Sequence, residues 1–243
     1  MRRHVLATAL LLALTPWVGA DDDVNRSLGV LPVGSDAYGS SYGEWSARHW
    51  QWLYSLPVDH HPLFDTADCS AGQSGHVWFL GGTFSTTNVG EGVVLGQVTR
   101  NCTIPPGTAL FFPIVDAECS TIEGNGTTEA DLRLCARETA DAIDPTSLRC
   151  EIDGQFVQNL AQFRVESPLF TFGPLPADNV LEFFGINAQA GATSPSISEG
   201  YYLLLAPRLI GRHQIHFYGE ADFRPLGGPI FIEDITYNLT VVP

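Results

Sequence analysis

Short segments of β-branched and aromatic residues, separated by Gly, Pro and Asn, are the feature that most limits the fold of this chain. In the last of them, DITYNLTVV, apolar residues occupy every second position: Ile235, Tyr237, Leu239 and Val241. This period of two predicts a strand in a sheet with one dry and one wet face. Similar segments are HVWFL, GVVLGQV, TALFFPIV, LRCEIDGQFV, NVLEFFGI, YYLLLAP and RHQIHFYGE. We therefore expect a mostly β protein, an antiparallel β-sandwich or jelly roll.

Two helices are expected to interrupt the strands. Ser41, followed three residues later by Glu44, has the spacing of a capping box, and Pro57 ends the helix that follows. Thr128 is placed to cap a second helix, inserted among the strands around residues 127–144.

The stretch YYLLLAPRLIGRHQIHFYGE indicates a hairpin that turns around Gly211. On a strand, His213 and His216 point to opposite sides, so we do not expect them to share a metal. His213 then lies with Ile215 on the apolar side. The polar side is either solvated surface or the floor of a ligand groove, and its candidate binding residues are Arg212, Gln214, His216 and Tyr218.

The N-terminal stretch MRRHVLATALLLALTPWVGADDD has the order of a secretory signal peptide: basic residues, an apolar run and small residues. We expect residues 1–20 to be removed and the rest, 21–243, to form one domain that is secreted or periplasmic. The apolar run over residues 5–14 is too short to span a bilayer.

The five cysteines all follow this segment, and in an oxidising compartment most of them are expected to pair. We favour a disulfide between Cys69 and Cys102, because each flanks a predicted strand. The pairing of Cys119, Cys135 and Cys150 is left open by the sequence.

Charge narrows the choice of partners. The chain has 27 acidic and 12 basic residues, a net charge of −15, and no lysine. Such a surface repels phosphate groups, which argues against nucleic-acid partners and against insertion into anionic membranes. The absence of lysine also excludes Schiff-base chemistry.

The segment FFPIVDAECS carries the strongest acidic candidates. Continued as a strand, it places four residues on one side: Phe112, Ile114, Asp116 and Glu118. Two carboxylates at the end of an apolar run suit the acid and base of a hydrolase or lyase, because their environments can drive the two pKa values apart. They are also ligands that calcium accepts, and the structural alternative is that they end the strand by accepting backbone hydrogen bonds.

The first helix carries more aromatic residues than one sheet can cover: Trp45, Trp50, Trp52 and Tyr54. One explanation is that the helix closes an end of the sandwich. The other is that an outward aromatic residue, with Trp50 as the candidate, stacks on a sugar or a partner. With the acidic charge and the absence of a nucleophile motif, this favours a module that binds a neutral glycan or another envelope component. A secreted hydrolase or lyase that uses Asp116 and Glu118 is the alternative.

Several separate motifs carry a resemblance: EWSARHWQWLYSLP, GQSGHVWFLGGTF, CTIPPGTALFFPIVDAECS, FRVESPLFTF, GYYLLLAPRLIGRHQIHFYG and DITYNLTV. Together they cover most of the chain after the signal segment, and they resemble a family of exported bacterial proteins of unknown function. The resemblance implies a secreted single-domain protein and assigns no catalytic residue.

Overall fold

A computed structural model describes residues 20–243 of the chain. The signal peptide expected over residues 1–20 lies outside this range except for its last residue. Within the described part, no helix has both the length and the apolar character needed to cross a membrane.

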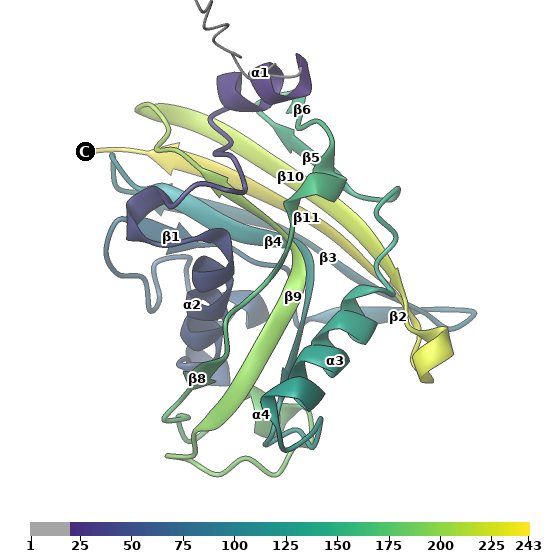
Figure 1. The fold of residues 1–243 in the computed structure, drawn as a ribbon. Helices are drawn as coiled ribbons and strands as arrows, with labels where there is room; N and C mark the ends of the chain where they lie inside the picture. Colours follow the sequence, from purple (N-terminus) through teal and green to yellow (C-terminus); the bar gives the residue numbers. More distant parts are fainter. Residues whose placement is uncertain (1–19) are drawn as a thin grey trace, which may run out of the picture.

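Eleven strands form two facing sheets, and Figure 1 shows the long strands β10, β11 and β3 running diagonally behind β4 and β9. The first sheet has the order β1-β4-β9-β7, and β8 also pairs with β9. Its strands are β1 (Val77–Phe79), β4 (Ala109–Ser120), β7 (Arg164–Glu166), β8 (Phe170–Phe172) and β9 (Ser194–Leu205). The second sheet has the order β2-β3-β11-β10-β5-β6. Its strands are β2 (Thr86–Gly90), β3 (Val93–Ile104), β5 (Arg149–Ile152), β6 (Gln155–Phe156), β10 (Gly211–Asp222) and β11 (Ile230–Val241).

The mostly β, sandwich-like fold is therefore confirmed, and so is the alternation in the last strand. Every second residue of β11 from Ile235 onwards is buried between the layers: Ile235, Tyr237, Leu239 and Val241. The sheets are mixed rather than wholly antiparallel, because β1 runs parallel to β4 and β3 runs parallel to β11.

The predicted hairpin around Gly211 is wrong. β9 pairs with β4 in the first sheet, whereas β10 pairs with β11 and β5 in the second. The chain leaves β9 at Ala206, whose N–H bonds to the Gly29 carbonyl, and then crosses between the layers. Two apolar strands in succession have the same sequence pattern whether they pair with each other or with different sheets.

Both expected helices are present. α2 (Tyr42–Tyr54) begins with the predicted capping box of Ser41 and Glu44, and Thr128 caps α3 (Glu129–Ala140). In Figure 1, α2 and α3 lie on either side of β4 and β9. A short helix, α1 (Ala20–Ser27), was not predicted.

The segment NVLEFFGI, predicted as a strand, instead begins with a fourth helix, α4 (Val180–Phe183). Asn179 accounts for the difference, because its side chain accepts a hydrogen bond from the Glu182 N–H and so caps a helical turn. The turn leaves Phe183 and Phe184 more than half exposed.

The disulfide between Cys69 and Cys102 is confirmed. A second disulfide joins Cys119 of β4 to Cys135 of α3, and it ties that helix to the first sheet. Cys150 is left as a free thiol and is buried.

Candidate functional site

A bulge in β4 decides where its acidic side chains point. The register between β4 and β9 shifts between Pro113 and Val115. Before the shift, Phe112 stacks on Phe217 of the second sheet with ring centroids 5.3 Å apart, and Ile114 packs near Gly219. A bulge turns the following side chains to the other face. The prediction that Phe112 and Ile114 share a side with the two carboxylates is therefore wrong.

After the bulge, Asp116 and Glu118 both point toward α2, as two residues that are two positions apart on a strand should. They enter different surroundings. Glu118 accepts a hydrogen bond from Tyr54 Oη at 2.7 Å and another from the Ser196 hydroxyl. Burial, followed by the neighbouring charge of Glu123, raises the pKa of Glu118 well above its usual range. Glu118 thus belongs to a closed cluster of hydrogen bonds.

Asp116 instead lines a cavity of about 310 Å³ together with Glu233, which belongs to the second sheet. We call this the acid cavity. It lies between α2, the buried loop that includes Gly82 and Thr83, and the edges of the two sheets. Its polar lining contains Asp116, Glu233, His49, Trp50 and Thr83.

Glu233 is only 7% exposed. The Thr83 N–H donates to its Oε1 at 3.1 Å, and no hydrogen bond to Oε2 is found among residues 20–243. Burial raises the pKa of Glu233 to about 8, and the charge of Asp116 adds to the increase. Because only one oxygen of this buried carboxyl group is hydrogen-bonded to the protein, the other oxygen can accept a hydrogen bond from a ligand.

Asp116 has the same arrangement. Tyr202 Oη donates to its Oδ2 at 2.8 Å. Burial raises the pKa of Asp116 to about 7, although the hydrogen bond from Tyr202 and the nearby Trp50 indole N–H both favour the charged form. The indole nitrogen itself is buried and has no partner at hydrogen-bond geometry in the described part of the chain.

His49 provides a further polar atom in the cavity wall. Its side chain is 1% exposed, and Nε2 donates to the Leu80 carbonyl at 3.0 Å. Burial lowers the pKa of His49 to about 4, so the ring is neutral near pH 7. Because Nε2 carries the proton, Nδ1 is an acceptor, and it has no partner among the described residues.

Apolar and aromatic side chains form the rest of the wall: Leu53, Leu63, Phe84, Val94, Pro113, Phe184 and Phe231. A concave, mostly apolar site with a few convergent polar groups and displaced pKa values is typical of a ligand or active site. The acid cavity can therefore accept hydrogen bonds from a ligand, bind a positive charge or exchange protons with a substrate.

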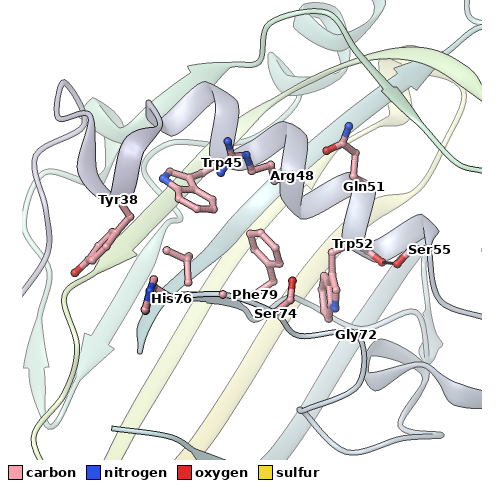
Figure 2. A pocket seen from close by; sticks show the side chains of 12 residues that line it. Tyr38, Trp45, Arg48, Gln51, Trp52, Ser55, Gly72, Ser74, His76 and Phe79 are labelled. Atoms are coloured by element: carbon pink, nitrogen blue, oxygen red, sulfur yellow. Dashed lines mark hydrogen bonds between the residues drawn. The ribbon is translucent and has the colours of Figure 1, made fainter. Parts of the chain in front are cut away.

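A second hollow is an open groove of about 610 Å³ between α2 and the segment from Gly72 to Phe79. Figure 2 shows α2 along one wall, with Phe79, Ser74 and His76 opposite and Tyr38 at one end. We call this the aromatic groove. The rings of Trp45, Trp52 and Phe79 are part of its lining, and none of its described lining residues is Asp or Glu. The two tryptophans are almost fully buried, so Phe79 and Tyr38 offer most of the accessible ring surface.

The predicted polar face of β10 lies on the outside of the second sheet. Arg212 and Gln214 line a shallow hollow of about 630 Å³ there, next to Asn101 and Asn238. His216 lies further along and pairs with Asp234 at 2.8 Å, and Tyr218 donates to Glu220. The four predicted residues therefore follow one strand without meeting in a common cavity.

His213 and His216 face opposite sides of the sheet, as predicted, and each pairs with a different carboxylate. Over residues 20–243, no group of three or more His, Cys, Asp or Glu side chains is arranged to hold a metal ion. The calcium alternative for Asp116 and Glu118 thus gains no third ligand of these types.

The structure brings the predicted residues Asp116 and Trp50 together in the acid cavity, and it adds Glu233 and His49. Glu233 was not predicted as a site residue. The signal was available, because extending the alternation of β11 back from Ile235 places Glu233 on the inner face. An acid on the dry face of a strand is unusual enough to mark a candidate site.

Comparison of the chain with protein-family models, with curated proteins and with solved structures finds no match.

Proposed function

We propose that this chain is an exported binding protein whose small ligand occupies the acid cavity. The observation that carries the proposal is the placement of two carboxyl groups from different sheets in one largely apolar cavity. Each has one oxygen held by the protein, through Tyr202 or Thr83, and one oxygen without a protein donor. Asp116 is only partly buried, and neither free oxygen belongs to the fully buried atoms without a partner, so a ligand that enters the cavity can reach both oxygens.

Export is supported by two disulfides, which persist in oxidising compartments and are rare in the cytosol of most organisms. It also agrees with the predicted signal segment. N-terminal sequencing of the protein recovered from outside the cytoplasm tests both the export and the cleavage near Ala20.

A thermal-shift screen of small molecules on residues 21–243 tests the binding function. Ligands of the acid cavity should stabilise the natural protein and not the Gly82→Ala variant, because a Cβ at Gly82 would lie 1.5 Å from Glu233 Oε1. Gly34→Ala is the matched control, since nothing lies within 4 Å of its Cβ. If no molecule in the screen stabilises Gly34→Ala without also stabilising Gly82→Ala, the result argues against the proposal.

Turnover of a ligand found in this way would make the protein an enzyme. The predicted hydrolase or lyase pair was Asp116 with Glu118, whereas the shared cavity favours Asp116 with Glu233. Single variants Asp116→Asn, Glu118→Gln and Glu233→Gln separate the two pairs. If activity is lost with Glu118→Gln and kept with Glu233→Gln, the cavity pair is not the catalytic one.

Binding of a neutral glycan in the aromatic groove is a second candidate function. In a chain with 27 acidic residues, a groove without any carboxylate in its described lining offers no partner to a cationic ligand, and its Arg48 lies over the Trp45 ring at 4.6 Å. Tyr38, 42% exposed, and Phe79 offer ring surface, while Gln51 and Ser74 offer hydrogen bonds to hydroxyl groups. Calorimetry with neutral polysaccharides tests this, with Tyr38→Ala as the variant and Leu226→Ala, at a residue 53% exposed, as a control. If none of the polysaccharides binds, this candidate function is ruled out.

A further inference from the structure

We infer that the ligand of the acid cavity is a small apolar amine, bound as its ammonium form between Asp116 and Glu233. This inference rests on the proposed binding function and adds the chemical class of the ligand. It follows from four properties of the cavity: its charge, its hydrogen-bond acceptors, its aromatic wall and its volume.

No basic side chain of the described residues lines the acid cavity. None of the described lining residues is Arg, and the chain has no lysine. The nearest influence is Arg100, which lowers the pKa of Glu233 but lies outside the lining and pairs with Asp65 at 2.7 Å. Buried carboxylates without a cation are unfavourable, so a ligand with a positive charge gains from both of them.

The cavity offers hydrogen-bond acceptors to an ammonium group. Asp116 accepts from Tyr202 at one oxygen and Glu233 accepts from the Thr83 N–H at one oxygen, so the second oxygen of each carboxyl can accept from a ligand. Nδ1 of the neutral His49, another lining residue, is also without a partner among the described residues. An ammonium group has three donors and no acceptor. At pH 8.5, where both carboxyls are mostly ionised, a carboxylate or phosphate ligand would meet negative charge, and we expect it not to bind.

The wall suits the rest of such a ligand. The rings of Trp50, Phe84, Phe184 and Phe231 line the cavity, and aromatic faces attract cations as well as apolar groups. The volume of about 310 Å³ lies at the lower end of the range of ligand pockets, roughly 300–1,000 Å³, so the ligand is small. Phe184 is 54% exposed, and with exposed Thr86 it places an accessible edge on the cavity.

Protons replace the ligand in the unliganded protein. Burial keeps the pKa of Asp116 at about 7 and that of Glu233 at about 8, so both carboxyls are largely protonated below pH 7. An ammonium ligand favours the ionised forms and displaces these protons. Amine binding should therefore release protons to the buffer and become tighter as the pH rises from 6 to 8.5.

The test uses three probes with similar bodies and different heads: 2-phenylethylamine, 2-phenylethanol and 3-phenylpropionate. Hexylamine and hexan-1-ol repeat the comparison with an aliphatic body. Calorimetry on residues 21–243 at pH 6 and pH 8.5, in two buffers with different heats of ionisation, gives affinity and proton release together. The variants are Glu233→Gln, with the exposed Glu138→Gln as a matched control.

We expect the amines to bind at least about tenfold more tightly than the alcohols at pH 8.5, with release of protons, and the carboxylate not to bind. Glu233→Gln should weaken the amines by at least about tenfold and leave the alcohols nearly unchanged. Equal affinity of amines and alcohols overturns the ammonium inference and leaves the binding function standing. If none of the probes binds and the wider screen also finds no cavity ligand, both proposals fail.

Discussion

Asp116 on β4 and Glu233 on β11 belong to different sheets, yet their carboxyl groups line one cavity. Asp116 lines this cavity because β4 bulges between Pro113 and Val115, which turns its side chain away from the layer that holds Phe112. In the unliganded protein the two groups raise the free energy of the ionised state. This cost of ionising the two carboxyl groups should appear as a loss of stability as the pH rises.

The first prediction concerns Glu233 and pH. Its pKa is about 8 in the folded protein and close to 4.5 in the unfolded chain, so between these values the folded state binds the additional proton. The stabilisation of the folded state by this proton is complete below about pH 4.5, and it is lost as the pH rises through 8. Between pH 6 and pH 9, urea unfolding should show the free energy of unfolding of the natural protein falling by roughly 3 kcal/mol relative to that of Glu233→Gln.

The comparison with the variant matters because His49 acts in the opposite sense. Its pKa is lowered to about 4, so its contribution to stability is lost as the pH falls below about 6.5. Glu138→Gln, at an exposed site on α3, should follow the natural profile. Parallel profiles for the natural protein and Glu233→Gln would mean that Glu233 is ionised at neutral pH.

The second prediction concerns the Tyr202 hydroxyl. Tyr202→Phe removes the 2.8 Å hydrogen bond to Asp116 Oδ2, which favours the ionised carboxylate. We expect the pKa of Asp116 to rise above 7 and stability at pH 9 to fall by about 1–2 kcal/mol, with a smaller loss at pH 5. Carbon-detected NMR titration of the aspartate side chains, with urea unfolding, checks both. Tyr201→Phe, at a buried neighbour, should leave the Asp116 titration unchanged.

Patterns that act over a few residues could be predicted from the sequence. The period of two in β11 and the capping boxes at Ser41 and Thr128 depend on local spacing. The disulfide between Cys69 and Cys102 spans 33 residues, and it was predicted because each cysteine flanks a predicted strand. Local spacing also places Asp116 and Glu118 on the same side of β4. Apart from the disulfide, these features are specified by the nearest neighbours in the chain.

The site itself depends on how distant segments meet, which is why most of it was missed. A bulge is one residue out of register with β9, and FFPIVDAECS reads as an uninterrupted strand without that partner. The parallel pairing of β3 with β11 joins segments more than a hundred residues apart. Alternation alone could have placed Glu233 on the inner face of β11. Its position in the same cavity as Asp116 could not be predicted, because nothing local relates β4 to β11.

The third prediction concerns the cysteines. Removing the second disulfide with Cys119→Ser and Cys135→Ser should cost about 3 kcal/mol, because the closed loop has a sequence separation of 16 residues. The buried Cys150 thiol, whose pKa is raised by burial, should not react with a thiol reagent until the chain unfolds. Mass spectrometry after labelling, with and without urea, counts the free thiols. Rapid labelling of Cys150 in the folded protein would contradict its burial.

The fourth prediction uses the close approach of backbone and acid at Gly82. A Cβ there would lie 1.5 Å from Glu233 Oε1, so Gly82→Ala must displace the carboxyl from the Thr83 N–H that holds it. The methyl group has no adjacent space, and we expect a loss of roughly 1–3 kcal/mol in the free energy of unfolding. Gly34→Ala, with no atom within 4 Å of its Cβ, should stay within about 0.5 kcal/mol of the natural protein. The double variant Glu233→Gln with Gly82→Ala should lose less free energy of unfolding than the sum of the two single variants, because both changes act on the same carboxyl group. Additive losses in this double-mutant cycle would show that the Gly82 loop does not depend on Glu233 for its position.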